Sequence, residues 1–340
     1  MRPIGAALVG TGMWAGRIMA AVGRTSSLEL VTCFSRDRAR KEAFAREAGC
    51  EAAPSFQAAV EDERVEAVLL VTPNSTHAEQ AVACAERGKH VFVEKPIADS
   101  LEEGRALRDA CEAAGVTLLV GHGLRRLGAA RAVERLLSEG ALGRVVLAEA
   151  NFSLAGTPTP GTWRYSRETC PGGPLLQLGV HHADTLLHWL GPAARVQGSF
   201  ARLVTEAEID DVGVALVQHE SGARSVISSS YVSPKTYSLR LSGSDGVLDY
   251  VTDASVWPRT ELMDGATTLR VTTAEGAREL PFQERDALVE ELDELARCVR
   301  GEAEPETGAE AGLAALALVL AALESHERGG IVSLGARVDG

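Results

Sequence analysis

The chain shows two different patterns of apolar and polar positions. In the first third, short runs that are apolar almost throughout alternate with segments in which apolar residues recur every three or four positions. Such runs are typical of parallel strands buried on both faces, and the second pattern is typical of helices that bury one side. The predicted strands are residues 4–9, 28–34, 65–71, 90–93 and 116–120.

Predicted helices lie between these strands, and glycines mark several of their ends. One helix runs to residue 48 and stops at Gly49, the next stops at Gly88, and a third covers residues 101–114. The regular alternation of strands and helices predicts an α/β fold with a doubly wound parallel sheet, the Rossmann arrangement.

The pattern changes after about residue 122. Helices are predicted over residues 130–139 and 175–190, a strand over 145–152, and a loop rich in Pro, Gly and Thr over 157–173. Further strands are predicted over residues 212–220, 223–229, 237–242, 247–251 and 269–273. We expect an open antiparallel or mixed sheet, with two leucine-rich helices closing the chain. The predicted domains are residues 1–122 and 123–340.

Composition excludes several functions. A net charge of −13 argues against nucleic-acid binding, which uses a basic face. We expect no membrane association, because we see no apolar run that approaches a membrane span. Met1-Arg2-Pro3 leads directly into a strand rather than a signal peptide. The six cysteines are scattered without a CxxC pair, so we expect free thiols in the cytoplasm and no metal site.

The first candidate site is the turn between the first strand and the first helix. Gly10 suits a turn closed to other residues, Gly12 lets the backbone approach a pyrophosphate, and the small Ala15 lets the helix pack on the strand. The phosphates would lie at the helix N-terminus. The alternative is a small-residue turn that binds nothing. The residues expected to contact a dinucleotide here are Gly10, Thr11, Gly12, Met13, Trp14 and Ala15.

The end of the second strand bears on which dinucleotide is bound. An acid at this point would bind the ribose 2′-hydroxyl of NAD, but here Ser35 holds that position and Arg36 follows. A hydroxyl and a guanidinium suit a 2′-phosphate, so the sequence favours NADP over NAD. Alternatively, Arg36 and Arg38 are solvated, and Asp37 caps the next helix or turns toward the ribose.

Two further segments follow buried strands, at the sheet edge where open α/β folds bind ligands. Glu94 and Lys95 follow the strand at residues 90–93, and Lys95 would face the nicotinamide end of the cleft. The segment after the third strand would also line the cofactor site, through Thr72, Pro73, Asn74 and His77. We expect His77 to pack near the cofactor without acid–base work.

The predicted helix at residues 175–190 bears Gln177, His181 and Asp184, which are spaced four and three apart and so share one face. Asp184 either orients His181 or anchors the helix. The preceding loop and the region after the first domain offer groups that suit a polyhydroxylated ligand, although Trp163 equally fits loop packing. These candidates are Trp163, Arg164, Tyr165 and Arg125.

The segments GTGMWAG, TPNSTH, GKHVFVEKP and GGPLLQLGVHHAD, in this order, resemble motifs of the Gfo/Idh/MocA family of NAD(P)-dependent oxidoreductases. The resemblance covers almost the whole chain. It implies a nucleotide-binding N-terminal domain and a C-terminal α/β domain whose open, mostly antiparallel sheet holds the substrate pocket and an oligomer interface. We therefore expect a homodimer or a homotetramer that acts on a carbohydrate or polyol. The family's EKP lysine maps to Lys95 and its helix histidine to His181, whereas Gln177 stands where many members have aspartate.

The expected reaction is hydride transfer between the nicotinamide and a secondary alcohol or ketone of a sugar, an inositol or a sugar derivative. His181 would accept the hydroxyl proton, and Lys95 would stabilise the negative charge on the same oxygen. Gln177 cannot take a proton, so it would orient the substrate or His181. One alternative is an NAD-dependent glycosidase or lyase that oxidises the sugar transiently. Another is a non-catalytic dinucleotide-binding sensor, although a sensor would need neither Lys95 nor His181.

Overall fold

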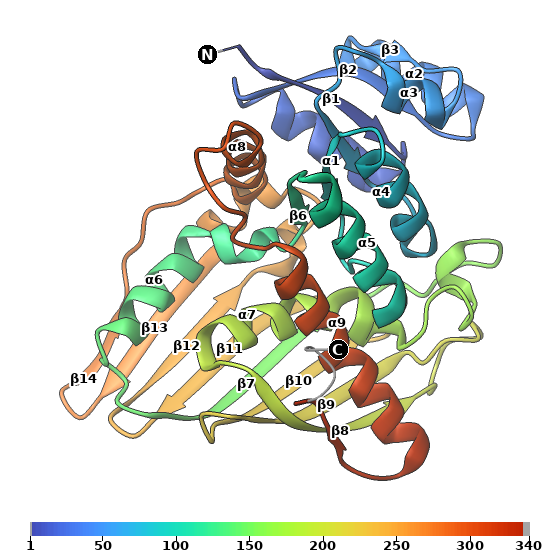
Figure 1. The fold of residues 1–340 in the computed structure, drawn as a ribbon. Coiled ribbons are helices and arrows are strands. Elements are labelled where there is room, and N and C mark those ends of the chain that lie inside the picture. Colours follow the sequence, from blue (N-terminus) through green and yellow to red (C-terminus); the bar gives the residue numbers. More distant parts are fainter. Residues whose placement is uncertain (1, 336–340) are drawn as a thin grey trace. The chain divides into compact units, whose positions relative to one another are not determined.

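The computed structural model describes residues 2–335, which form two compact units, each with its own sheet (Figure 1). Unit 1 comprises the residues up to 123 together with 287–313. Unit 2 comprises residues 124–286 and those from 314 onward. The chain leaves unit 1 near the predicted boundary at residue 122, and later returns to it.

Unit 1 is built on a sheet with the strand order β3-β2-β1-β4-β5-β6, in which each neighbouring pair is parallel. The order runs outward in both directions from β1, as in a doubly wound Rossmann sheet, so the predicted fold class is confirmed. β1 and β4 are buried along their whole length, as their apolar runs predicted. The strands are β1 (Ile4–Val9), β2 (Leu28–Phe34), β3 (Glu51–Ala52), β4 (Ala67–Leu70), β5 (His90–Val93) and β6 (Leu118–Val120).

Side-chain caps mark the starts of three helices of unit 1. Asp37, Ser55 and Ser100 each accept a hydrogen bond from the first turn of α2, α3 and α5, and Ser100 forms a capping box with Glu103. The helices are α1 (Met13–Val22), α2 (Arg38–Ala48), α3 (Phe56–Glu61), α4 (His77–Ala85), α5 (Leu101–Ala114) and α8 (Ala287–Val299).

Helix α8 belongs to unit 1, although the sequence pattern placed residues 123–340 together. Its leucines Leu288, Leu292 and Leu295 are buried in the core cluster that also holds Ala15 and Ile18 of α1. An apolar stripe shows that one face of a helix is buried, but not against which sheet. The sequence therefore indicated where the chain passes from unit 1 to unit 2, but not that residues 287–313 belong to unit 1 again.

Unit 2 contains a mixed sheet with the order β14-β13-β12-β11-β7-β10-β9-β8-β15. β7 and β10 are parallel, and the other neighbouring pairs are antiparallel, so the prediction of a mostly antiparallel sheet is confirmed. The predictions missed the short β14 and β15 and the polar-rich β8. The strands are β7 (Val145–Ser153), β8 (Ala193–Ala201), β9 (Val212–His219), β10 (Arg224–Ser230), β11 (Thr236–Gly243), β12 (Gly246–Thr252), β13 (Thr267–Thr273), β14 (Gly276–Glu279) and β15 (Val332–Ser333).

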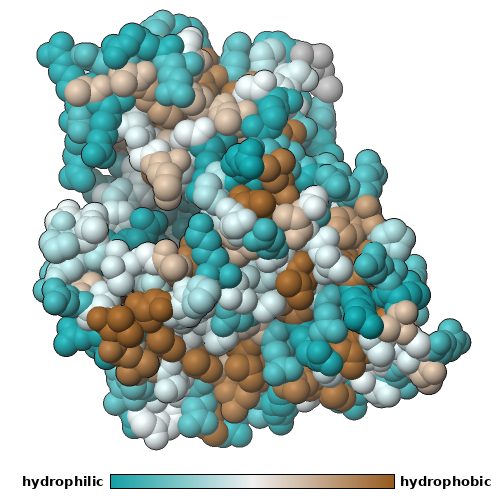
Figure 2. Space-filling view, turned by 180° about the vertical axis from the view of Figure 1, so that it is seen from behind, coloured by the Kyte–Doolittle hydropathy of each residue, from teal (hydrophilic) through white to brown (hydrophobic). Residues whose placement is uncertain are grey.

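Helices cover one face of this sheet and leave the other open. α6 (Gly128–Ser138) and α7 (Val180–Leu190) lie on the near side of the sheet in Figure 1. Burial alternates along the strands accordingly: in β9, Ala215 and Val217 are buried, whereas Leu216 between them is 47% exposed. Apolar side chains form patches among polar ones on the surface seen in Figure 2.

Helix α9 (Ala309–Arg328) corrects our expectation about apolar runs. It is long and apolar enough, by length and composition alone, to cross a membrane, with a mean hydropathy of 1.4. Over half of its apolar window, 56%, is buried inside the structure, as in the core helix of a globular protein. One such helix is weak evidence for a membrane span.

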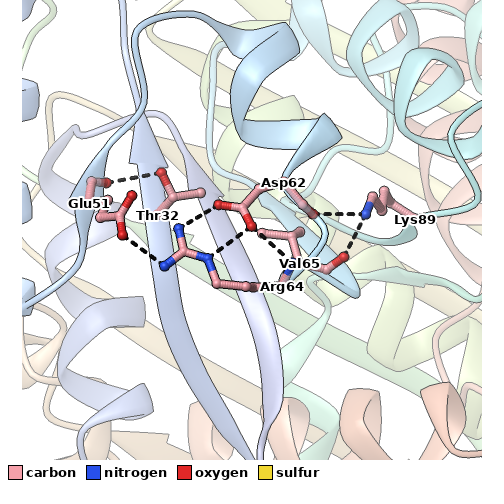
Figure 3. A network of polar contacts seen from close by, with 6 residues as sticks. All are labelled: Thr32, Glu51, Asp62, Arg64, Val65 and Lys89. Atoms are coloured by element: carbon pink, nitrogen blue, oxygen red, sulfur yellow. Dashed lines mark hydrogen bonds and ion pairs between the residues drawn. The ribbon is translucent and has the colours of Figure 1, made fainter.

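A polar network joins the amino ends of strands in unit 1 (Figure 3). The guanidinium of Arg64, just before β4, donates to Asp62 at 3.0 and 2.7 Å and to Glu51 at 2.8 Å, and the backbone N–H of Arg64 donates to Asp62 at 2.9 Å. Lys89, just before β5, donates to the backbone oxygens of Asp62 and Val65. These contacts lie at the strand ends opposite to those that lead into the predicted cofactor motifs.

Candidate active site

The glycine-rich turn has the geometry expected of a phosphate-binding turn. Gly10 has a φ of +97°, and a Cβ there would lie 2.4 Å from the backbone oxygen of Val71, so only glycine fits. A Cβ at Gly12 would meet nothing within 4 Å, and Gly12 has no side chain to cap α1. Met13 is exposed and Ala15 is fully buried. The exposed start of α1 therefore fits a dinucleotide pyrophosphate.

Contacts at the end of β2 show which groups Ser35 and Asp37 bind. The Ser35 hydroxyl accepts a hydrogen bond of 2.8 Å from Thr11 in the glycine-rich turn. Asp37 caps α2, because its carboxylate accepts from the backbone N–H of Arg40 at 3.0 Å. Arg36 is exposed beside them. The one carboxylate in this stretch is therefore engaged with α2, and the strand end offers a hydroxyl and a guanidinium.

His77 joins the two loops that follow β4 and β5. Its ring is fully buried, with Nδ1 3.0 Å from the backbone oxygen of Pro96 and Nε2 3.0 Å from that of Thr72. Burial lowers the pKa of His77 to about 4, against the effect of these two oxygens. A neutral histidine held in this way fits the packing role expected of it.

Glu94 connects the lysine loop to the glycine-rich turn. Its carboxylate is buried, accepts a hydrogen bond from the indole N–H of Trp14, and lies 3.3 Å from the backbone nitrogen of Lys95. Burial raises the pKa of Glu94 to about 7, although Lys95 and Trp14 oppose this. The Arg17 guanidinium lies over the Trp14 ring, 4.3 Å from its centroid. Lys95 is half-buried and is followed by a cis peptide bond to Pro96.

The histidine-bearing segment of unit 2 begins with a π-helical turn, Leu175–Gly179, that runs into α7. Gln177 lies in the wide turn and His181 in the first turn of α7, so the α-helical spacing assumed from the sequence does not hold between them. A Cβ at Gly179 would lie 2.9 Å from the Ser229 hydroxyl of β10, so glycine allows close packing here. Turns of this kind are frequent at functional sites.

Aromatic rings surround the adjacent histidines. The His181 ring lies 5.8 Å from that of Phe152 and 5.7 Å from that of Trp257. His182 packs 4.8 Å from Tyr237 and is fully buried, which lowers its pKa to about 4. Both histidines are buried and both rings lie near Phe152, but they differ in their second neighbour, which is Trp257 for His181 and Tyr237 for His182.

Arg125 and Asp184, both predicted to contact substrate, bind each other. Nε and one terminal nitrogen of Arg125 donate to the two carboxylate oxygens at 2.6 and 2.5 Å. Both side chains are buried. The pair ties the segment before α6 to the middle of α7, which favours the anchoring role for Asp184 over the orientation of His181.

The three predicted substrate residues of the loop make different contacts. Arg164 is exposed and stacks on the half-buried Trp163, with 4.2 Å from the guanidinium carbon to the ring centroid. The Tyr165 hydroxyl donates to the backbone oxygen of Glu206 at 3.2 Å. Tyr165 thus fastens this loop to the segment between β8 and β9, while Trp163 and Arg164 form its outer surface.

The sequence missed three rings that contact the histidine pair: Phe152, Tyr237 and Trp257. The first two occupy inward positions of β7 and β11, which alternation identifies as core but not as neighbours of His181. Trp257 follows β12 in an irregular segment that had no predicted element. Within residues 2–335, no group of three or more His, Cys, Asp or Glu side chains is arranged to hold a metal ion, and the six cysteines are free thiols.

Unit 1 therefore has the construction of a dinucleotide-binding domain, and the histidine segment of unit 2 supplies a candidate acid–base group. Together they define an NAD(P)-dependent oxidoreductase. The chain belongs to the Gfo/Idh/MocA family. The model of the family's NAD-binding Rossmann domain matches residues 4–122, and that of its C-terminal domain matches residues 130–249.

Known proteins similar to this chain include sugar-active enzymes. It is 30% identical to 1,5-anhydro-D-fructose reductase of Ensifer adhaerens, over 90% of this chain and 91% of that protein. It is 31% identical to D-xylose 1-dehydrogenase (NADP(+)) 2 of Haloferax volcanii, over 92% and 94%. A solved structure from Desulfitobacterium hafniense, described as a candidate NADPH-dependent oxidoreductase, superposes with a TM-score of 0.96 at 34% identity and covers 99% of both chains.

Proposed function

We propose that this enzyme transfers hydride between NADP and a secondary alcohol or ketone carbon of a sugar or sugar-derived polyol. The observation that supports this most directly is that the residues on both sides of Lys95 are held by hydrogen bonds. The loop before it is buried and bound to the glycine-rich turn through Glu94 and Trp14, and the loop after it is bound to His77. The two sugar-active relatives support the substrate class.

In this proposal the nicotinamide would accept or supply the hydride, and side chains of the protein would stabilise charge on the substrate oxygen and transfer its proton. The Lys95 ammonium hydrogen-bonds that oxygen and stabilises the negative charge that it carries after its proton is removed and before hydride has left the carbon. His181 takes the hydroxyl proton during oxidation and returns it during reduction. Gln177, which has no proton to exchange, orients the substrate or His181.

The preference for NADP is assigned to Ser35 and Arg36. The Arg36 guanidinium would donate to a 2′-phosphate, and the Ser35 hydroxyl would do so by turning from the backbone oxygen of Asp37, to which it donates at 3.2 Å. A free 2′-hydroxyl would find no acid to bind it, because Asp37 caps α2. We expect Arg36→Ala to raise the KM for NADP about tenfold and to change the KM for NAD less than about twofold. Arg38→Ala is the matched control, since Arg38 pairs with Glu42 at 2.7 Å. Equal effects on both cofactors would contradict the assignment.

Steady-state kinetics on a panel of sugars and polyols test the catalytic roles. Lys95→Ala and His181→Ala should each lower kcat by about 100-fold or more, with the affinity for the dinucleotide nearly unchanged. Lys235→Ala and His188→Ala are control variants, since Lys235 is exposed and His188 lies on the same helix as His181. Unchanged turnover in either test variant would refute its role. Turnover without net reduced nicotinamide would instead support the NAD-dependent glycosidase or lyase.

We also propose that the open face of the unit 2 sheet pairs two copies of the chain. Val214, Leu216 and Val226 form an apolar strip on β9 and β10, bordered by Glu149 of β7. A strip of this kind on an open sheet is typical of an interface between subunits. Sedimentation should show a dimer or a tetramer, and Leu216→Glu should shift it toward the monomer. A wild-type monomer at micromolar concentration would refute this proposal.

A further inference from the structure

Of the three aromatic rings that contact His181 or His182, one differs from the others in exposure. Phe152 is fully buried and Tyr237 is 5% exposed, as expected of inward positions on β7 and β11. Trp257 is half-buried and lies outside the sheet, yet its ring contacts both Phe152, at 4.6 Å, and His181, at 5.7 Å. Of these three rings, Trp257 therefore has the most surface available to a ligand.

The backbone around Trp257 is fixed. Trp257 closes a short 3₁₀ turn, Ala254–Val256, whose start is capped by Asp253 through a hydrogen bond of 2.9 Å from the N–H of Ser255. The Asp253 N–H donates to the backbone oxygen of Ala266, and the Trp257 N–H to that of Ala254. The ring is T-shaped against both of its neighbours, at 73° and 74°. This large, half-buried ring is thus held in one orientation beside the proposed base.

We propose that Trp257 is a specificity-determining residue that packs against the apolar C–H face of a ring-form sugar whose hydroxyl-bearing carbon is presented to His181. This inference rests on the proposed function. A pyranose with mostly equatorial hydroxyls directs its axial C–H bonds to the two ring faces, which makes each face a flat, weakly polar surface. An indole ring matches such a surface in size and polarity, and loses little conformational entropy on binding.

Packing of Trp257 against a C–H face should also make the enzyme discriminate between cyclic and open-chain substrates. An alditol with the same hydroxyl stereochemistry has no fixed C–H face, because rotation about each C–C bond mixes apolar and polar edges. Trp257 should therefore favour the cyclic member of each matched pair. Its contribution should appear in binding, since the ring contacts the sugar face equally before and during hydride transfer.

The test compares each aldopyranose of the panel with its own alditol, using the holoenzyme and the variants Trp257→Phe and Trp257→Leu. Trp257→Leu should raise the KM for the best pyranose about tenfold, with kcat within about twofold and a smaller change for the alditol. Trp257→Phe should restore most of the preference. Trp189→Phe is the control, because Trp189 is a half-buried tryptophan on α7 outside the ring contacts described above.

An unchanged KM for the pyranose in Trp257→Leu would overturn the inference. An equal loss for both members of a pair, or a fall in kcat that Phe does not restore, would show a packing role and would also overturn it. If wild-type enzyme turned over no sugar, the proposed function would fail separately. Calorimetric binding of the pyranoses to cofactor-loaded protein would then decide: weaker binding in Trp257→Leu supports the inference, and no binding to wild type overturns it.

Discussion

Each unit has a buried carboxyl group among its candidate site residues, Glu94 in unit 1 and Asp184 in unit 2. In unit 1, Glu94 is an acid kept in an apolar environment between an indole N–H and the backbone of Lys95. In unit 2, Asp184 is an acid fully matched by the fork of Arg125. Burial raises the pKa of the first carboxyl group to about 7, whereas the second is bound by a guanidinium, so we expect different effects when each is mutated.

Glu94 should make stability depend on pH. Its pKa is raised from 4.5 in the unfolded chain to about 7 in the folded one. The folded state therefore holds a proton that the unfolded state loses, and the stability that depends on it is complete below pH 4.5 and lost as the pH rises to 7. Glu94→Gln should become relatively more stable over this range, by up to about 1.4 kcal/mol per pH unit.

Urea unfolding without dinucleotide, at pH 5.5, 6.5 and 8, measures this difference. Glu63→Gln is the control, because Glu63 is exposed. A free-energy difference between the Glu94→Gln variant and wild type that stays constant with pH would contradict the raised pKa.

Arg125 and Asp184 should behave as a coupled structural pair. Removing one partner leaves a buried charge, so Arg125→Met or Asp184→Leu alone should cost about 3–5 kcal/mol of unfolding free energy. The double variant should cost less than either single one, since it leaves no charge unpaired. Additive losses in chemical denaturation would show that the two residues act independently, and would reopen the substrate-binding role predicted for both.

At the level of elements, the N-terminus of α6 is capped by a residue that is distant in the sequence. Asp264, between β12 and β13, accepts hydrogen bonds from the N–H groups of Gly128, Ala129 and Arg285 at 2.6, 3.1 and 2.8 Å. This carboxylate does the work that a local cap does in α2 and α5. It joins α6, which follows Arg125 in the chain, to the segment that precedes α8.

Asp264→Ala should leave three backbone N–H groups, two of them buried, without this acceptor, and should cost about 2–4 kcal/mol of unfolding free energy. Asp264→Asn keeps one acceptor oxygen and should lose less. Hydrogen exchange at Gly128 and Ala129 would locate the effect, with faster exchange in the Ala variant. Unchanged exchange at both amides would contradict the capping role.

The sequence predicted most elements because each depends on local signals. Gly49 at +68° ends α2, Ser100 caps α5, and apolar runs mark β1 and β4. Local signals do not report contacts between distant segments. The return of α8 to unit 1, the cap of α6 by Asp264 and the rings around His181 all depend on tertiary packing.

For the candidate site, motifs located the residues but not their partners. Lys95, His181 and the glycine-rich turn were predicted from their places beside predicted strands and helices and from the resemblance to the family, and NAD(P) binding follows from the family. The pairing of Arg125 with Asp184 and the π-helical turn at Gln177 could not be found in this way. An ion pair between residues 59 positions apart leaves no periodic trace, and a π turn differs from an α turn by a single residue.

At the scale of the whole molecule, the proposed reaction uses both units: unit 1 binds the dinucleotide, and His181 of unit 2 transfers the proton. The most direct test uses a sugar substrate from the panel carrying deuterium on the carbon to be oxidised, incubated with NADP and the enzyme. The account predicts reduced nicotinamide one mass unit heavier by mass spectrometry, in proportion to the ketone formed. Reduced nicotinamide without deuterium, or sugar conversion with no net reduced nicotinamide, would contradict it.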